Sequence, residues 1–261
     1  MISPSDRIVL PRDVRLTSDG LHDPVRGATF PLNASARLVV GAGTVAGAAG
    51  ALRARFGVDA LADTHAFVAQ LNARLLLEVV PLRPRARLAW RWLRGLPVML
   101  PTGALPVFPS RRRFVATSAY SSIVVTGVRA VGPVATAYGA LAAVATTLTL
   151  HALAWVTPCA AAAVAGGVVA HELGHLLQLR GVPACVAVRG LRVSVLHARG
   201  ARTRRVAAGG PLAGTALAAV AFAAFFVAPS PELAAIAALE SLQLVGFTVL
   251  TSDGRRLCAR S

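Results

Sequence analysis

The sequence predicts a small α+β domain followed by an all-α, polytopic membrane domain with about four transmembrane helices. Hydrophobic residues make up 55% of the 261 positions and charged residues 15%, whereas a soluble chain carries about 25% charge. Seven of the eleven acidic residues lie within residues 1–78, so a mixed-charge globular segment comes first. The remainder consists of long apolar blocks separated by arginine clusters, which is the pattern of a membrane protein.

The basic excess is unevenly distributed. All 27 basic residues are arginines, the net charge is +16, and nine arginines but no acidic residue lie between Val79 and His171. Arginine clusters between apolar blocks mark the cytoplasmic loops of membrane proteins. The charge therefore indicates topology more than a nucleic-acid partner. The composition excludes an ordinary cytosolic enzyme and a disordered tail, and three widely spaced cysteines do not form the pattern of a disulfide framework.

The first domain, residues 1–80, is predicted to combine short strands with helices. Residues 12–32 alternate extended runs with turn residues, which predicts two or three short strands. A helical pattern runs over 34–56, where Gly57 can end it, and another helix is expected over 65–76. One face of this last helix collects the apolar residues Phe67, Val68, Leu71 and Leu75. These elements predict a winged-helix-like domain.

Two segments of this domain carry a resemblance: LHDPVRGATFPLNASA at 21–36 and LRARFGVDALADTHAFVAQLNARLLLEV at 52–79. Both resemble the PqqD-like family of peptide chaperones, which recognise the leaders of ribosomally made, modified peptides. The resemblance implies that a precursor's leader peptide adds a strand to a sheet edge near 27–31 and lies beside the helix near 63–75. The expected peptide contacts are Gly27, Ala28, Thr29, Phe30, Phe67 and Leu71.

A winged-helix domain can also bind DNA. The helix that would enter the groove carries Arg74 as its only basic residue, beside Asp63 and Glu78. Such a helix would neutralise phosphates poorly. We therefore expect a peptide partner and no nucleic acid.

Residues 81–129 are predicted to form a basic linker at the membrane interface. They are rich in proline and arginine, and Trp90 and Trp92 lie among four of the arginines. Anionic headgroups attract such a segment. Residues 130–261 then form the membrane domain, in which each predicted span is long enough to cross a hydrocarbon core of about 30 Å. The predicted spans are 131–156, 158–179, 206–228 and 233–252.

The arginines also predict the orientation. The segment 180–205 carries seven arginines and no acidic residue, while the gaps around Thr157 and at 228–232 carry no arginine. By the positive-inside rule, both termini and the 180–205 segment are cytoplasmic. We expect no cleavable signal peptide, because the first residues are polar and no apolar run of suitable length follows them. We expect a multi-pass protein of the cell membrane, in contact with the lipid bilayer.

Residues 171–175 read H-E-L-G-H, an H-E-x-x-H motif inside the second predicted span. Positions i and i+4 share a helix face, so His171 and His175 can bind one zinc ion, and Glu172 can act as a general base on a water molecule. Ionisable residues inside a membrane span are costly and usually functional. The alternative is that the three side chains only hydrogen-bond to neighbouring helices.

A zinc site of this kind needs a third protein ligand. The choices are His151, His197, Glu240 and Asp253. The histidine pair is expected roughly 6 Å inside the cytoplasmic surface, and Asp253 ends the fourth span on that side. His151, roughly 30 Å from that end of its helix, and Glu240, about 20 Å from Asp253, lie at other depths. His197 lies in the loop and can reach the site, although loop histidines are usually solvated.

Residues 130–260 resemble the site-2 protease family of intramembrane zinc peptidases. The resemblance rests on H-E-L-G-H, on Gly209-Gly210-Pro211-Leu212-Ala213-Gly214 and on Ser252-Asp253-Gly254-Arg255. It implies Zn²⁺ held by His171, His175 and Asp253, activation of water by Glu172, and an active site lined by Gly210, Pro211 and Gly214. Gly214 replaces an asparagine that is frequent in the family, and the asparagine and proline usual before Asp-Gly are absent. Small residues at 209–214 can also simply bring helices together.

These observations predict a membrane-embedded zinc endopeptidase that hydrolyses peptide bonds near the cytoplasmic face. Its cytoplasmic module would recruit a precursor peptide, and a peptide or membrane protein would be its substrate. One alternative is a non-catalytic membrane scaffold that docks precursor peptides for modification or export. Another is a membrane-tethered DNA-binding regulator that proteolysis releases.

Overall fold

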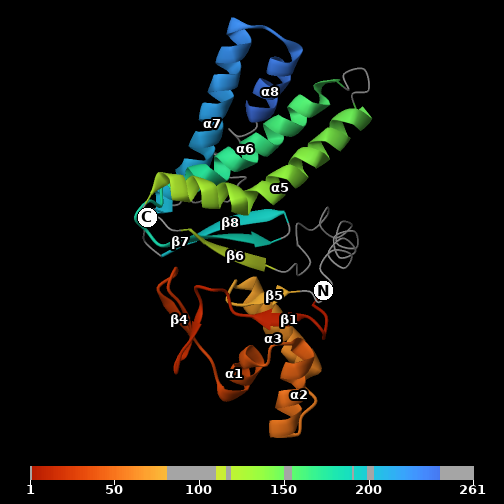
Figure 1. The fold of residues 1–261 in the computed structure, drawn as a ribbon, viewed down its shortest axis with the longest axis vertical. Coiled ribbons are helices and arrows are strands. Elements are labelled where there is room, and N and C mark those ends of the chain that lie inside the picture. Colours follow the sequence, from red (N-terminus) through yellow and green to blue (C-terminus); the bar gives the residue numbers. More distant parts are fainter. Residues whose placement is uncertain are drawn as a thin grey trace. The chain divides into compact units, whose positions relative to one another are not determined.

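The computed structural model describes residues 2–80, 110–115, 119–149, 155–189, 191–198 and 203–241. The chain is mostly helical, with small sheets in its N-terminal part (Figure 1). It divides into two compact units. Unit 1 comprises Met1–Phe114 with Ala187–Gly190, and unit 2 comprises Val115–Val186 with Leu191–Ser261. The residues from 81 to 109 lie outside the described part of the chain, so the domain boundary expected near residue 80 stays a prediction.

Unit 1 contains two small antiparallel sheets. The first pairs β1 (Arg7–Val9) with β5 (Glu78–Val80), and the second has the order β2-β3-β4. The strands of the second sheet are β2 (Arg15–Leu16), β3 (Gly20–Asp23) and β4 (Ala28–Pro31). They lie within the segment 12–32 that the alternation predicted. Gly20 (φ 144°) begins β3 at a position where a Cβ atom would collide with the Phe30 carbonyl, so this turn requires glycine.

Three helices follow these strands. They are α1 (Ala34–Gly41), α2 (Val45–Phe56) and α3 (Leu61–Ala73). The stretch 34–56, predicted as continuously helical, is divided because Gly43 adopts φ 74° and the Thr44 side chain caps α2 by accepting from the Gly47 amide at 3.0 Å. Gly57, with φ 71°, ends α2 as predicted.

The core of unit 1 is formed jointly by α1, α2, α3 and the strands. Val68 and Leu71 of α3 are 0% and 5% exposed and pack with the buried Leu21 and Leu76. Leu75, predicted to continue the apolar face of a helix ending at residue 76, instead adopts φ 61° beyond the end of α3. The left-handed conformation turns the chain back toward β5, so the helix is shorter at this end than predicted.

Unit 2 contains four helices in the described part of the chain. They are α5 (Tyr120–Thr149), α6 (Thr157–Leu177), α7 (Thr203–Val227) and α8 (Pro231–Ser241). The first three are long and apolar enough to cross a membrane. The remainder of the predicted fourth span beyond Ser241 lies outside the described residues.

The described residues also form a third sheet with the order β6-β7-β8. Its strands are β6 (Ser110–Val115), β7 (Ala184–Arg189) and β8 (Arg192–His197).

The helix α5 begins at Tyr120, earlier than the predicted span at 131. Its 30 residues correspond to a length of about 45 Å, which exceeds a hydrocarbon core of about 30 Å. The first turns of α5, up to the exposed Arg129, can therefore extend beyond the core. The sequence located the uncharged part of the helix and missed its extension from Tyr120 to Ala130, which contains Arg129.

Glycines allow close contact between the helices of unit 2. A Cβ atom on Gly139 of α5 would lie 2.8 Å from the Ala161 carbonyl of α6. A Cβ atom on Gly174 of α6 would collide with the Gly209 carbonyl of α7, and the reverse also holds. In Figure 1, α6 lies between α5 and α7, and α8 packs on α6 and α7. Small residues at such crossings are the usual means by which membrane helices approach each other.

Candidate functional site

The two histidines of the H-E-x-x-H motif meet on one face of α6. Their Nε2 atoms are 3.2 Å apart, and their rings stand edge-to-face with centroids 4.8 Å apart. Two nitrogens that share a tetrahedral zinc ion at about 2.0–2.1 Å lie about 3.4 Å apart. The separation of His171 and His175 therefore fits two ligands of one zinc ion.

A backbone contact orients His175. Its Nδ1 atom lies 2.5 Å from the Val206 carbonyl oxygen of α7, so Nδ1 carries the proton and Nε2 presents its lone pair. The Gly210 amide nitrogen is 3.3 Å from the same Nδ1 atom, but a nitrogen that donates to a carbonyl cannot accept from this amide. The shorter contact, to the Val206 carbonyl, is therefore the hydrogen bond that Nδ1 makes. In a regular helix, Gly210 N–H also points to Val206 O, so both donors converge on one carbonyl.

Gly210 forms the opposite wall of the histidine pair. A Cβ atom at this position would collide with the Nε2 atom of His175 and would lie 2.8 Å from that of His171. Only a residue without a side chain leaves space at the two nitrogens. Pro211 and Gly214, the other predicted lining residues, are buried in α7. Gly214 lies one turn beyond Gly210 and therefore on the same helix face.

A cavity of about 310 Å³ opens beside the motif within unit 2. His171 and Glu172 line it together, both half-buried, whereas His175 is 7% exposed. The remaining lining residues are Val134 and Tyr138 of α5, Val168 of α6, and Leu191, Arg192 and Val193 at the start of β8. Glu172 and His171 thus line the same cavity, which is large enough to hold water.

The third ligand is unresolved among the described residues. No group of three or more His, Cys, Asp or Glu side chains gathers there as a complete metal site. His197 therefore does not join the pair, and instead its Nδ1 atom lies 2.8 Å from the Ala198 carbonyl. Glu240 is 2% exposed in α8 and does not join it either. Asp253 and His151 lie outside the described residues, so the preference for Asp253 stays a prediction.

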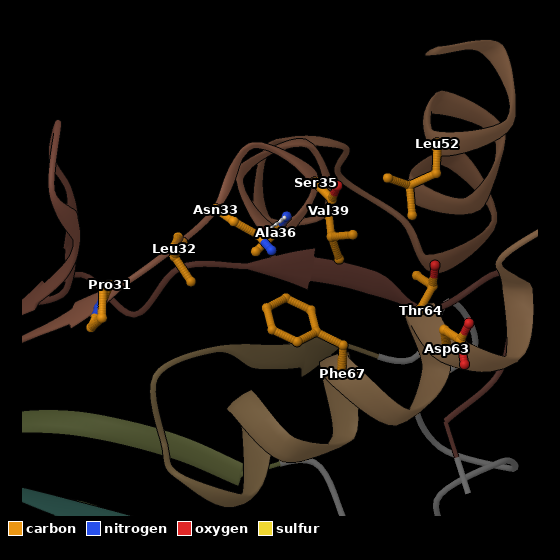
Figure 2. Close-up of a pocket in the computed structure, with 10 residues that line it drawn as sticks. All are labelled: Pro31, Leu32, Asn33, Ser35, Ala36, Val39, Leu52, Asp63, Thr64 and Phe67. Atoms are coloured by element: carbon orange, nitrogen blue, oxygen red, sulfur yellow. Dashed lines mark hydrogen bonds between the residues drawn. The ribbon is translucent and has the colours of Figure 1, made fainter. Parts of the chain in front are cut away.

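Unit 1 carries a second candidate site, a pocket of about 310 Å³ beside α3 (Figure 2). Its walls are the segment Pro31-Leu32-Asn33, the helix α1 and the first turns of α3. Figure 2 shows Phe67 pointing from α3 toward Ala36 and Leu32. The other lining residues are Ser35, Val39, Leu52, Asp63 and Thr64. The pocket lies between the end of β4 and α3, where the resemblance placed a bound peptide.

The pocket has an apolar floor and a polar end. At that end Thr64 is 1% exposed, and its hydroxyl has no hydrogen-bond partner among the residues with defined placement. Asp63 is exposed beside it. Of the predicted peptide contacts, Phe67 lines the pocket, Ala28–Phe30 lie in β4, and Gly27 forms the preceding turn with φ 61°. Leu71 is buried in the core of unit 1, away from this surface.

A buried ion cluster stabilises unit 1. The Arg112 guanidinium donates to the two Asp23 oxygens at 2.9 and 3.0 Å and to Asp13 at 2.6 Å. It also donates to the Leu75 carbonyl at 3.0 Å. The Arg112 and Asp23 side chains are 1% and 0% exposed. Burial alone would raise the pKa of Asp23, but the hydrogen bonds and charge of Arg112, aided by Arg26, outweigh it and hold that pKa below its usual value.

Sequence reasoning missed Arg112, Thr64, Tyr138 and Arg192. Arg112 belongs to a run of three arginines that looked like an interfacial cluster, and Thr64 is one polar residue in an amphipathic helix. Tyr138 could have been found from the sequence, because it is the only tyrosine inside a predicted span.

Comparison of the chain with family models, with curated proteins and with solved structures finds no match.

Proposed function

We propose that the protein is a membrane-embedded zinc endopeptidase that cleaves peptide bonds near the cytoplasmic membrane face. One observation carries the proposal: the His171 and His175 Nε2 atoms lie 3.2 Å apart on a helix apolar enough to cross a membrane, and Glu172 lines the adjoining cavity. The similarity to site-2 proteases at 171–175, 209–214 and 252–255 points to the same activity. The arginine-rich 180–205 segment supports the cytoplasmic placement.

In this proposal, His171, His175 and Asp253 hold the zinc ion. Zinc would polarise the peptide carbonyl and make a water molecule more acidic. The Val206 carbonyl keeps the proton of His175 on Nδ1, so Nε2 remains available as a ligand. Glu172 takes a proton from the attacking water and passes it to the leaving amine. Gly210 keeps the space at the two imidazoles open.

Zinc binding tests the site. The double variant His171→Ala, His175→Ala should purify without zinc, whereas the wild type should hold about one zinc ion per chain, because two of the expected ligands are gone. Gly210→Ala should also lose most of its zinc, since its Cβ atom occupies the space at both nitrogens. Metal analysis of full-length protein in detergent measures the zinc content.

Gly166→Ala is the matched control. Gly166 lies in the same helix as the histidines, and a Cβ atom there would meet nothing within 4 Å, so this variant should keep its zinc. Zinc in the double histidine variant equal to that in the wild type would overturn the metal site. A wild type without zinc and without cleavage would favour the non-catalytic scaffold.

We further propose that unit 1 docks a precursor peptide for the membrane domain. The edge strand β4 can extend the sheet by main-chain hydrogen bonds through Ala28–Phe30, whereas Pro31 has no amide hydrogen. An apolar side chain of the peptide would fill the pocket at Phe67. A tethered module of this kind would raise the local peptide concentration to the order of mM.

Two variants separate docking from folding. Phe67→Ala should weaken peptide binding by roughly tenfold, because it removes an apolar wall of the pocket. Thr64→Val keeps the shape of the pocket and should leave peptide binding unchanged, because the Thr64 hydroxyl is buried and a bound peptide does not reach it. Thr64→Val should not reduce the stability of unit 1, since its hydroxyl is buried without a partner. The probe is a labelled synthetic peptide with the sequence of a candidate precursor leader, and anisotropy with the full chain measures affinity.

Phe56→Ala serves as the control for Phe67→Ala. Phe56 is 47% exposed and does not line the pocket, so binding should be unchanged. Equal affinity of wild type and Phe67→Ala would contradict docking in this pocket. Salt-sensitive binding of DNA in place of the peptide would instead favour the regulator.

A further inference from the structure

The cavity beside the H-E-x-x-H motif has a phenol in its wall that the proposed mechanism does not use. Tyr138 of α5, which is half-buried, lines the cavity together with His171 and Glu172. The other described lining residues are Arg192, three valines and a leucine. Apart from the expected zinc ligand His171, Tyr138 is therefore the one neutral residue of this lining whose side chain donates a hydrogen bond.

The packing of α5 on α6 directs this phenol toward the motif. Gly127, near the start of α5, packs against Leu173 of α6. Gly139, farther along α5, packs against Ala161, which lies earlier in α6, so the two helices run antiparallel. Side chains lean toward the N-terminus of their own helix. The phenol of Tyr138 therefore leans toward the half of α6 that carries the motif, and the imidazoles of the motif lean back toward the phenol.

The opposite wall of the histidine pair offers no side-chain donor. Residues 209–214 of α7 read G-G-P-L-A-G, and none of these side chains forms hydrogen bonds. Pro211 has no amide hydrogen, and the Gly210 amide points to the Val206 carbonyl within its own helix. The next side chain, that of Thr215, donates to the Pro211 carbonyl at 2.8 Å. A negative charge that develops at the site finds no side-chain donor on this segment of α7.

We propose that the Tyr138 hydroxyl stabilises the transition state of peptide-bond cleavage, an inference that rests on the proposed peptidase function. When water adds to the carbonyl carbon, an electron pair of the C=O bond moves to the oxygen, and Glu172 takes a proton from the water. The phenol donates a hydrogen bond to the oxygen that becomes negative and keeps its own proton. When the pair returns, the C–N bond breaks, the Glu172 proton passes to the leaving amine, and Tyr138 is unchanged.

A neutral donor is well suited to this cavity. Valines and a leucine form much of the lining, and in such surroundings a donor aimed at a developing charge stabilises it more than it would in water. Before attack the peptide oxygen carries only a partial charge, so the hydrogen bond strengthens as the reaction proceeds. An interaction made mainly in the transition state raises kcat and leaves KM nearly unchanged.

Tyr138→Phe tests this role, because it removes the hydroxyl and keeps the ring. In zinc-loaded, full-length protein in lipid nanodiscs, kcat for a peptide substrate should fall about 100-fold, with KM within about twofold of the wild type. Binding of a phosphinic peptide gives a second readout without turnover, because its tetrahedral, anionic group imitates the negative oxygen. The variant should bind it about 100-fold more weakly than the wild type. In a Glu172→Gln background, Tyr138→Phe should leave the affinity for the uncleaved substrate unchanged.

Tyr120→Phe is the matched control. Tyr120 is the other tyrosine of the chain, and it does not line the cavity. Its ring lies under the Arg180 guanidinium, with the centroid 4.3 Å from the guanidinium carbon, a contact that phenylalanine can also make. Loss of this hydroxyl should change neither cleavage nor binding of the phosphinic peptide. Both variants should keep the wild-type zinc content, because neither phenol is an expected ligand.

The possible results separate this role from the peptidase function. If Tyr138→Phe cleaves the substrate and binds the phosphinic peptide as the wild type does, the role of Tyr138 is overturned and the peptidase function stands. Equal weakening of substrate and phosphinic peptide would assign the phenol to substrate binding, and loss of zinc would assign it to metal retention. Either result overturns the transition-state role. A zinc-loaded wild type that neither cleaves peptides nor binds the phosphinic peptide would overturn the peptidase function itself.

Discussion

Glu172→Gln should lose peptide-bond cleavage by at least about 100-fold while it keeps its zinc. Glutamine has the size of glutamate but cannot accept the proton of the attacking water. The two histidines should stay in place, because both belong to α6 and the Val206 carbonyl holds Nδ1 of His175. Both effects are measured on one preparation. Cleavage is measured with a peptide that a library screen identifies as a substrate of the wild type, and zinc retention is measured by metal analysis.

Glu232→Gln provides the same chemical change elsewhere. Glu232 lies in the first turn of α8 and outside the cavity lining, so both cleavage and zinc content should match the wild type. Cleavage by Glu172→Gln at the wild-type rate would remove Glu172 from the mechanism. If Glu172→Gln loses zinc together with activity, Glu172 is needed to retain the metal, and the result contradicts its role as a general base.

The histidine pair was predictable because its geometry is local. Residues four apart share a helix face whatever surrounds the helix, and the structure brings the two Nε2 atoms to 3.2 Å. Three apolar helices were predictable for a similar reason, since length and hydropathy are properties of continuous segments. Gly210 lies against both imidazoles because α7 packs on α6, and periodicity alone does not predict such a contact between separate segments.

Contacts between distant segments were not predictable from local pattern. Arg112 contacts Asp13 and Asp23, which lie 99 and 89 positions away along the chain. Within its run of three arginines nothing distinguishes the buried one from an exposed one. Arg192 and Tyr138 meet at the cavity only because β8 packs on α5. One boundary does have a local pattern. Gly43-Thr44, a turn residue followed by a good N-cap, marks the end of α1 and the start of α2.

Arg112→Gln should lower the stability of unit 1 by about 3–5 kcal/mol. The substitution leaves the Asp23 carboxylate buried without its main cationic partner, and it removes the donors to Asp13 and to the Leu75 carbonyl. Hydrogen exchange of the β1 and β5 amides in the full-length protein reports the opening free energy of this unit. The Leu75 contact adjoins the turn into β5, so exchange should accelerate there.

Arg53→Gln is the matched control. Arg53 pairs with Asp59 at 3.8 Å, but both side chains are at least 70% exposed, and such pairs contribute little. The amide exchange rates of the Arg53→Gln variant should match those of the wild type. The double variant Arg112→Gln, Asp23→Asn should recover part of the stability, because the stranded charge is gone. Wild-type exchange rates in Arg112→Gln would show that the cluster does not hold unit 1 together.

The same cluster predicts a dependence on pH. Because Arg112 lowers the folded-state pKa of Asp23, this carboxylate stabilises unit 1 fully above the ordinary aspartate pKa of about 3.9. That contribution is lost as the pH falls through the lower folded value. In Arg112→Gln the burial that raises the pKa of Asp23 remains while its main opponent is absent, so the Asp23 carboxylate should stabilise unit 1 less, and the loss of stability that acid causes through Asp23 should shrink or reverse. Asp23→Asn should remove this contribution to the pH dependence, and an unchanged profile in both variants would exclude Asp23 as its origin.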